Sequence, residues 1–340
     1  MSATTENTPD HDNAKQITAA FSPQQVTAIA IGRNEGERLI RCLQSLLPQV
    51  GRVIFVDSGS TDGSAERAAE MGAEVVQLDM SKPFTAARAR NAGFAKVSDG
   101  EFVQFVDGDC EVESGWIATA LAAMAADPRL AITAGRRRER HPEASIYNRL
   151  CDAEWDTPIG PAQAVGGDML VRRAALQQIG GFDPTLIAGE EPEMCLRMSR
   201  AGWSIRRLDA PMTIHDAAMT RYGQWARRSR RAGHAFAEVS WRYRDGPERF
   251  WQRETKRSVI WAIALPVLIV LAATVTPWAW WLLWAYPVQI ARMALRDPDR
   301  KDRWPRAFYT MFGKFPEARG VLEFHLRRLM GRRSGLIEYK

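Results

Sequence analysis

The sequence predicts an α/β protein with a mostly parallel sheet flanked by helices, followed by a C-terminal helical region that associates with a membrane. In the N-terminal half, short apolar runs of strand length alternate with segments whose apolar residues recur every three or four positions. Such alternation is typical of a parallel sheet covered by helices. Towards the C-terminus, residues 259–291 contain no charged side chain, and this stretch is longer than one bilayer span needs.

The strands and helices of the α/β part follow in order along the chain. Val26–Ile31 is a continuous apolar run, as expected of a strand that is covered on both faces. A helix follows, because apolar residues recur at helical spacing between positions 39 and 47. The next expected elements are a strand at Val53–Val56, a helix at Ala65–Met71, a strand at Glu74–Leu78, a helix at Ala86–Ala95, a strand at Phe102–Val106, a helix at Trp116–Ala126 and a last strand at Pro211–Ile214.

The composition limits the class of protein and its surroundings. A net charge of +6 favours anionic partners such as phosphates or anionic lipid. The four cysteines, at positions 42, 110, 151 and 195, form no Cys-x-x-Cys pair, so we expect no zinc site and a reducing, cytoplasmic setting. Residues 1–24 are polar and predict a disordered N-terminal tail rather than a signal peptide.

The uncharged stretch predicts a membrane-associated region at residues 241–300. Tryptophans gather at positions 278–284, and tryptophan is typical of membrane interfaces. Basic residues lie on both sides of the stretch, and positive flanks stay cytoplasmic. We therefore expect a hairpin of two short helices that turns near Thr276-Pro277, or a re-entrant segment; a buried helix pair of a soluble protein is the alternative. Residues 301–340 are expected to form a basic amphipathic tail at the membrane surface.

Polar side chains follow three of the expected strands at the point where each strand ends. Asn34 and Glu35 follow the first strand, Asp57 ends the second, and Asp107 and Asp109 follow the fourth. In parallel sheets, ligands bind beyond the carboxyl ends of the strands. Two adjacent carboxylates repel each other unless a cation lies between them, and oxygen ligands suit Mg²⁺ or Mn²⁺. A metal site that holds a diphosphate is one interpretation, and an ordinary Asp-Gly-Asp surface turn is the other.

The order of these motifs resembles the family 2 glycosyltransferases, which have the GT-A fold, a Rossmann-type sheet. The resemblance covers about residues 25–235, and we assign residues 25–240 to this domain. Beyond residue 215 the chain is similar to bacterial membrane-associated members concerned with surface polysaccharides or glycolipids. Together with the basic flanks, this leads us to expect the catalytic domain on the cytoplasmic side of the inner membrane. The matching segments are Asn34-Glu35, Asp57–Asp62, Ala87–Gly93, Asp107–Asp109, Gly166-Gly167 with Arg172-Arg173, Gly180–Asp183, and Glu190–Arg197 with Gly202-Trp203.

The resemblance implies a nucleotide-diphospho-sugar donor and transfer of the sugar, with inversion, to the hydroxyl of a lipid-linked or saccharide acceptor. By motif, Asp57 would contact the nucleoside. Asn34 and Glu35 would lie near the ribose or base, and Arg90 and Asn91 would line the donor site.

A divalent metal, Mn²⁺ or Mg²⁺, is implied as the cofactor. Asp109 would bind the metal, and Asp107 would contact the ribose, the metal or a metal-bound water. His215, at the end of the last expected strand, is either a further metal ligand or a structural histidine.

The catalytic base is expected in the pair Glu190-Glu191, which stands where the family has Glu-Asp; Glu191 is our candidate because one carboxylate suffices for direct inversion. Processive members of the family carry Gln-x-x-Arg-Trp. Residues 224–228 read Gln-Trp-Ala-Arg-Arg, which predicts the addition of one sugar per encounter.

Four further residues are expected near the acceptor or the diphosphate: Gly167, Asp168, Arg227 and Arg228. The alternative for the two arginines, which belong to the cluster 227–231, is a helix face that lies against lipid headgroups. A second basic run, Arg136–Arg140, is expected in an exposed loop.

Two other function classes are weighed against glycosyl transfer: a nucleotidyltransferase, and a non-catalytic membrane scaffold derived from a glycosyltransferase. Neither Gly-x-Gly-x-x-Gly after the first strand nor Gly-x-x-x-x-Gly-Lys-Ser/Thr occurs, which disfavours a dinucleotide fold and a P-loop. The acidic motifs argue against the scaffold. We expect a membrane partner and no nucleic-acid partner.

Overall fold

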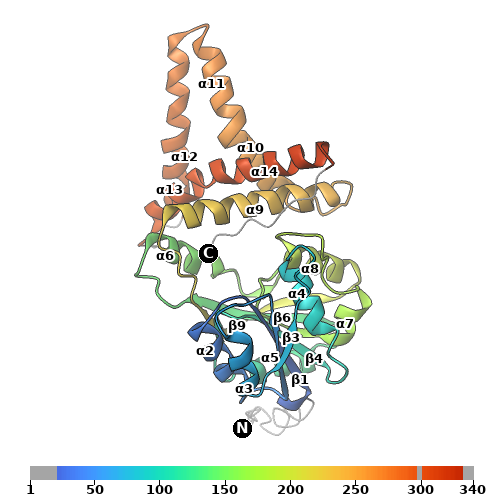
Figure 1. Cartoon of the computed structure of the whole chain (residues 1–340). Coiled ribbons are helices and arrows are strands. Elements are labelled where there is room, and N and C mark those ends of the chain that lie inside the picture. The colour runs from blue at the N-terminus through green and yellow to red at the C-terminus, as the bar shows by residue number, and fades with distance from the viewer. Residues whose placement is uncertain (1–20, 297–300, 332–340) are drawn as a thin grey trace, which may run out of the picture.

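A computed structural model describes residues 21–296 and 301–331 of the chain (Figure 1). The predicted N-terminal tail falls mainly on residues 1–20, which lie outside the described residues, as do residues 297–300 and 332–340. The described residues form a mixed α/β domain with a layer of helices above it and a helical hairpin that projects from this layer. The predicted α/β fold class is confirmed.

The sheet begins with four parallel strands. β1 (Val26–Gly32) pairs with β2 (Arg52–Asp57) on one side and β4 (Phe102–Asp107) on the other, and β2 pairs with β3 (Glu74–Gln77). Their carboxyl ends meet at one edge, where Gly32 lies beside Asp57 and Ile31 lies beside Asp107. These are the strands that the apolar runs predict.

The second half of the sheet contains both strand directions. β8 (Met169–Arg172) is antiparallel to β4 and to β6 (Leu130–Glu139), β6 is parallel to β9 (Ser204–His215), and β9 also pairs with β5 (Cys110–Val112) and β7 (Gly160–Pro161). The expectation of an exposed loop at Arg136–Arg140 is wrong, because residues 136–139 belong to β6. Side chains of a strand point alternately to its two faces, so a run of arginines in β6 need not lie wholly in solvent.

Helices cover both faces of the sheet. Ala28 and Ala30 of β1 join a core with α2 (Glu37–Leu46), α3 (Ser64–Glu70) and α5 (Trp116–Ala126). Ile29 and Ile31 point the other way and pack with α4 (Ala86–Phe94), α7 (Arg173–Gln178) and α8 (Glu190–Arg200). This alternation explains why the strand is apolar throughout. Two further elements are the 3₁₀ turn η1 (Pro23–Gln25) and α6 (Ile146–Trp155).

Above the sheet, α9 (Tyr222–Arg242) lies side by side with α14 (Lys314–Leu329) (Figure 1). Glycines permit the close approach of the two helices. A Cβ at Gly233 would collide with the backbone of Glu317, and one at Gly320 would collide with the carbonyl oxygen of Arg230. Arg230 and Glu323 join the helices by an ion pair with a distance of 2.7 Å between Nε and Oε2.

The hairpin rises from this layer. Its first arm is α10 (Gln252–Val259), the π-helical turn η2 (Ile260–Ala264) and α11 (Leu265–Ala273); its second arm is the 3₁₀ helix η3 (Pro277–Trp284) and α12 (Ala285–Ala294), which leads towards α13 (Arg303–Phe312). Apolar side chains at its tip are exposed: Leu271 by 62% and Trp278 by 73%. Among the described residues, one helical run, Gln252–Ala273, is long and apolar enough to cross a membrane.

Candidate active site

A cavity of about 1000 Å³ lies between the carboxyl edge of the parallel strands and α9. The residues after β1 and β4, the segment before β8 and the start of α8 line its lower side. Its upper wall comes from α9, whose residues 228, 231, 232, 235 and 236 recur at helical spacing and face the cavity. Segments that are far apart in the sequence therefore share one hollow.

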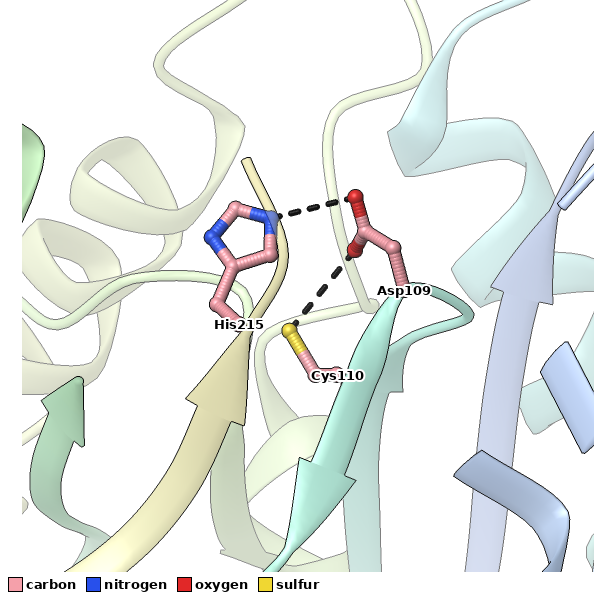
Figure 2. Close-up of side chains that lie close together, drawn as sticks. All are labelled: Asp109, Cys110 and His215. Carbon is pink, nitrogen blue, oxygen red and sulfur yellow. Dashed lines mark hydrogen bonds and ion pairs between the residues drawn. The ribbon is translucent and has the colours of Figure 1, made fainter. Parts of the chain in front are cut away.

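Asp109 and His215 lie side by side in this cavity (Figure 2). Asp109 occupies the turn between β4 and β5, and His215 ends β9; the pairing of β5 with β9 sets Cys110 opposite His215. As a result, Asp109 Oδ2 and His215 Nε2 are 3.0 Å apart, although the residues are separated by 106 positions. Both side chains are buried.

The chemistry of this pair fits a divalent metal. Burial lowers the pKa of His215 to about 4, with a further contribution from the positive charge of Arg137. The imidazole is therefore neutral near pH 7, the form that binds metals. A carboxylate oxygen suits Mn²⁺ or Mg²⁺, and a neutral imidazole nitrogen is a common ligand of transition metals. Cys110 lies within the same cluster, but burial raises the pKa of its thiol well above the usual value, so it stays protonated and is a poor ligand.

Arg90, on α4, holds three carboxylates of the cavity in place. Its Nη1 lies 3.1 Å from Glu190 Oε1 and 2.9 Å from Glu191 Oε1, and its Nη2 lies 3.0 Å from Asp107 Oδ1. Burial by itself lowers the pKa of Arg90, but the carboxylates of Glu191, Asp107 and Glu190 outweigh it, and the net pKa is raised. The guanidinium is therefore permanently charged and offsets the repulsion among its acidic partners.

Glu191 is the unusual carboxyl of this group. Burial raises its pKa to about 7, and the negative charge of Glu190 adds to the rise, while Arg90 opposes it. A carboxylate whose pKa lies close to the working pH is suited to accept a proton during catalysis. Both glutamates start α8, after Gly189, whose φ of +81° is accessible to glycine with little strain.

A second buried pair supports Asp107 from the other side. Asp168, just before β8, accepts hydrogen bonds from the Asp107 backbone N–H at 3.1 Å and from Thr213 Oγ1 at 2.7 Å. Arg137, in β6, forms an ion pair with Asp168: its Nη2 is 2.8 Å from Asp168 Oδ2. The same nitrogen is 3.7 Å from Asp107 Oδ2. Gly167 precedes Asp168, and a Cβ there would collide with Arg90 Nη2 and would lie 2.9 Å from Asp107 Oδ2. The glycine therefore lets the backbone approach the carboxylate.

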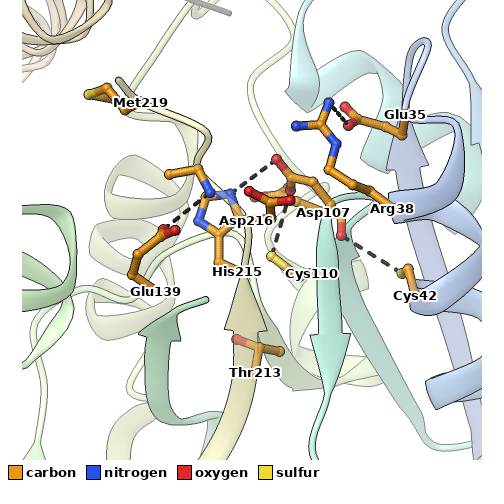
Figure 3. Close-up of polar contacts among 12 residues, drawn as sticks. Glu35, Arg38, Cys42, Asp107, Cys110, Glu139, Thr213, His215, Asp216 and Met219 are labelled. Carbon is orange, nitrogen blue, oxygen red and sulfur yellow. Dashed lines mark hydrogen bonds and ion pairs between the residues drawn. The ribbon is translucent and has the colours of Figure 1, made fainter. Parts of the chain in front are cut away.

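Asn34 and Glu35 line the cavity next to the strand ends. Glu35 pairs with Arg38 at 2.7 Å, and the thiol of Cys42 lies 3.8 Å from the carbonyl oxygen of Asp107 (Figure 3). Asn34 has a φ of +56°, and its Oδ1 accepts a hydrogen bond of 2.7 Å from the Thr61 N–H. This contact ties the loop after β1 to the loop after β2.

Three residues of the predicted site are not among the described residues that line the cavity: Asp57, Asn91 and Arg227. Asp57 lies at the same sheet edge, and its carboxylate accepts a hydrogen bond from the Ser60 N–H at 3.1 Å. Asn91 binds both backbone groups of Phe182, at 2.7 and 2.9 Å. Arg227 lines a smaller hollow of about 450 Å³ at the start of α9.

Arg228 lines the cavity, as predicted for an acceptor or diphosphate contact, and forms a bidentate ion pair with Glu154 of α6 at 2.6 and 2.8 Å. Arg137, Glu154 and Trp251 also line the cavity, although the sequence did not predict them there. Arg137 could have been found from the sequence, because side chains alternate between the two faces of a strand and one arginine of the run must then point inward. No comparable local signal marks the other two.

Comparisons with known proteins agree with this geometry. The profile of "Glycosyl transferase family 2" matches residues 27–177, and that of "Glycosyl transferase family group 2" matches residues 149–294. The chain belongs to the family 2 glycosyltransferases.

Individual relatives are distant. The pre-mycofactocin glycosyltransferase of Mycobacterium tuberculosis is 29% identical over 238 residues, which cover 66% of this chain and 49% of that protein, so the chain spans about half of its length. Glycosyltransferase AglE of Haloferax volcanii is 23% identical over 219 residues, 61% of this chain and 71% of that protein. Among solved structures, the mannosyltransferase PcManGT of Pyrobaculum calidifontis superposes with a TM-score of 0.60 at 20% identity and covers 91% of this chain and 92% of its own; this similarity shows the GT-A fold.

The glycine before Asp168 yields a first prediction. In Gly167→Ala the added Cβ would displace the guanidinium of Arg90 and the carboxylate of Asp107, so we expect turnover to fall about 10- to 100-fold, equivalent to about 1.4–2.8 kcal/mol in the barrier. Gly166→Ala is the matched control, because a Cβ there would meet its nearest atom, Arg137 Nη2, at 3.9 Å, an ordinary contact. Steady-state rates of both variants check this; equal rates would contradict the close approach at Gly167.

The raised pKa of Glu191 yields a second prediction. A catalytic base must be deprotonated, so kcat/KM should fall as the pH drops through about 7, by about tenfold per pH unit at the acid end. Removal of the neighbouring charge in Glu190→Gln should move this acid limb to lower pH. Glu191→Gln should lower the rate about 10²–10⁴-fold and abolish the limb. Rates measured between pH 5.5 and pH 9 test this, and an unchanged acid limb in Glu191→Gln would exclude Glu191 as the base.

Proposed function

We propose that this protein transfers a sugar from a nucleotide-diphospho-sugar to a hydroxyl of a lipid-linked acceptor, with inversion, in the synthesis of a surface polysaccharide or glycolipid. The observation that carries the proposal is that one cavity holds both the Asp109–His215 pair and a glutamate with a raised pKa, Glu191. The first suits a metal and a diphosphate, and the second suits proton removal from an acceptor.

The donor is assigned to the strand edge. Asp109 and His215 would hold Mn²⁺ or Mg²⁺, with Asp107 beside them. When bound, the cation offsets the negative charge that develops on the leaving diphosphate. The PcManGT structure contains GDP-mannose and Mn²⁺, which supports a nucleotide-sugar donor and a divalent metal for this chain.

The acceptor hydroxyl gives up its proton as its oxygen attacks the sugar. Glu191 takes that proton, and Arg90 keeps the carboxylate directed into the cavity through the contact of 2.9 Å. A single displacement from the face opposite the leaving group needs one base and inverts the configuration. Glu190, which shares the same guanidinium, raises the pKa of Glu191 and so adjusts the base.

A lipid-linked acceptor and a cytoplasmic position at the inner membrane are supported by the C-terminal half. The hairpin exposes an apolar surface at its tip, and apolar side chains of α13 and α14 are exposed beside it, among them Trp304, Phe308, Leu326 and Leu329. A surface of this kind suits burial in a bilayer. Arg228 and Arg231 of α9 line the cavity on the side of this layer, where they suit the phosphate groups of a lipid carrier.

The donor is tested by thermal stabilisation and by hydrolysis of a panel of UDP-, GDP- and dTDP-sugars with detergent-purified protein and Mn²⁺. We expect one nucleotide sugar to raise Tm in the presence of the metal, and Asp109→Asn to lose this shift and at least about 100-fold in turnover. Asp127→Asn, at an acidic residue outside the cavity, is the control. A turnover rate of Asp109→Asn equal to that of the wild type would rule out Asp109 as a metal ligand.

The membrane assignment is tested by flotation with vesicles of phosphatidylethanolamine and phosphatidylglycerol. The exposed Leu268 and Leu271 lie in α11, and replacing both by Arg should abolish most of the binding, because each charge costs about 2.5–3.5 kcal/mol in a bilayer. Ala118→Arg, at an exposed position of α5, should bind as the wild type does. Unchanged flotation of the double variant would show that the hairpin does not enter the bilayer.

A further inference from the structure

Trp251, the residue before α10, has a backbone conformation that is rare for a large side chain. Its φ is +55° and its ψ is +11°, in the left-handed region, and Arg249 two residues earlier has a φ of +49°. For a bulky residue such a conformation is a strained outlier, and it persists only where the surrounding structure fixes it. Neither strand pairing nor helix formation requires it here, since the loop 243–251 joins two helices.

The surroundings fix the ring of Trp251 against the start of the helix that carries the proposed base. A Cβ at Gly189 would lie 2.9 Å from its Cζ3 and 3.2 Å from its Cη2. Gly189 directly precedes Glu190 and Glu191. On another side, the ring of Phe236 from α9 meets it edge to face at 5.0 Å. The left-handed turn thus directs an indole ring to the peptide next to the acidic pair.

The ring also belongs to the cavity wall. Trp251 and Phe236 line the cavity together with Ala235 and Ala232 of α9, and Glu191 lines it beside them. This wall is apolar and aromatic, whereas the strand edge is acidic and contains the Asp109–His215 pair. The base must contact the acceptor hydroxyl and not the diphosphate. The cavity wall next to Glu191, which contains Trp251 and Phe236, therefore faces the acceptor.

We infer that Trp251 is an acceptor-binding residue whose indole packs against the C–H face of a sugar ring, so that the acceptor presents a saccharide hydroxyl to Glu191. Sugar rings carry an apolar face of C–H groups with slight positive charge, which the negative face of an aromatic ring attracts. This inference rests on the proposed function and narrows it: the group that receives the sugar is itself a glycoside rather than a bare lipid phosphate.

The test uses transfer from the donor identified above to n-octyl glycosides of glucose, galactose, mannose and N-acetylglucosamine, with dodecyl phosphate as the rival acceptor. Trp251→Gly removes the ring, and glycine adopts a φ of +55° without strain. Trp251→Phe keeps an aromatic face. Arg249→Gly is the matched control, because Arg249 also has a positive φ in the same loop, is exposed and is not among the described residues lining the cavity.

We expect Trp251→Gly to raise KM for the glycoside about tenfold or more, and to leave the KM for the donor within about threefold of the wild-type value. Trp251→Phe should keep KM within about threefold, and Arg249→Gly should match the wild type. Unchanged glycoside KM in Trp251→Gly, an equal rise in Arg249→Gly, or transfer to dodecyl phosphate but to no glycoside would each overturn the inference. A wild-type protein that turns over no nucleotide sugar would instead refute the proposed function.

Discussion

The contact on which the site depends is the one between Arg90 and its three carboxylates. The guanidinium is 2% exposed and lies within 3.1 Å of oxygens from Asp107, Glu190 and Glu191. Acidic groups gathered this closely in a buried place repel each other, and removal of the cation that pairs with all three typically costs about 3–5 kcal/mol. β4, α4 and α8 meet at this point, so the same contact organises the fold and the chemistry. Gly167 packs closely against the carboxylate of Asp107, and Asp168 accepts a hydrogen bond from its backbone N–H.

α9 connects this site with α14 and with the apolar hairpin that we propose to enter the membrane. One of its faces contributes Arg228, Ala232 and Phe236 to the cavity, and another packs on α14 through Gly233. The loop that follows α9 brings Trp251 to Gly189, next to the proposed base, and then continues directly into the apolar hairpin. The cavity wall that we assign to the acceptor and the apolar hairpin are therefore parts of one continuous segment, so an acceptor at the proposed membrane surface would lie close to both.

Local sequence patterns predict the first half of the sheet well, because β1, β2 and β4 are covered on both faces and their apolar character is continuous. The acidic residues after these strands were found by the same reasoning. The contact of Asp109 with His215 depends on the pairing of β5 with β9, and no local pattern states which strands pair. Arg137 was expected in an exposed loop because three consecutive arginines are typical of a solvent-exposed segment. In the structure its side chain points inward, where the carboxylate of Asp168 pairs with its charge. The orientation of Trp251 follows from a backbone angle that no residue type specifies.

The closeness of α9 and α14 has a consequence for anyone who wishes to work with the catalytic half alone. The sequence suggests an expression boundary just after residue 240. A protein that ends there would lack α14, which packs on α9, and would expose His234 and Ala237 to water, although both are buried in the structure. It would also lack the indole beside the base. The shortened protein would be prone to self-association through the bared helix and would lack part of its active-site wall, so a soluble surrogate of this enzyme calls for redesign of that helix surface, not for simple excision.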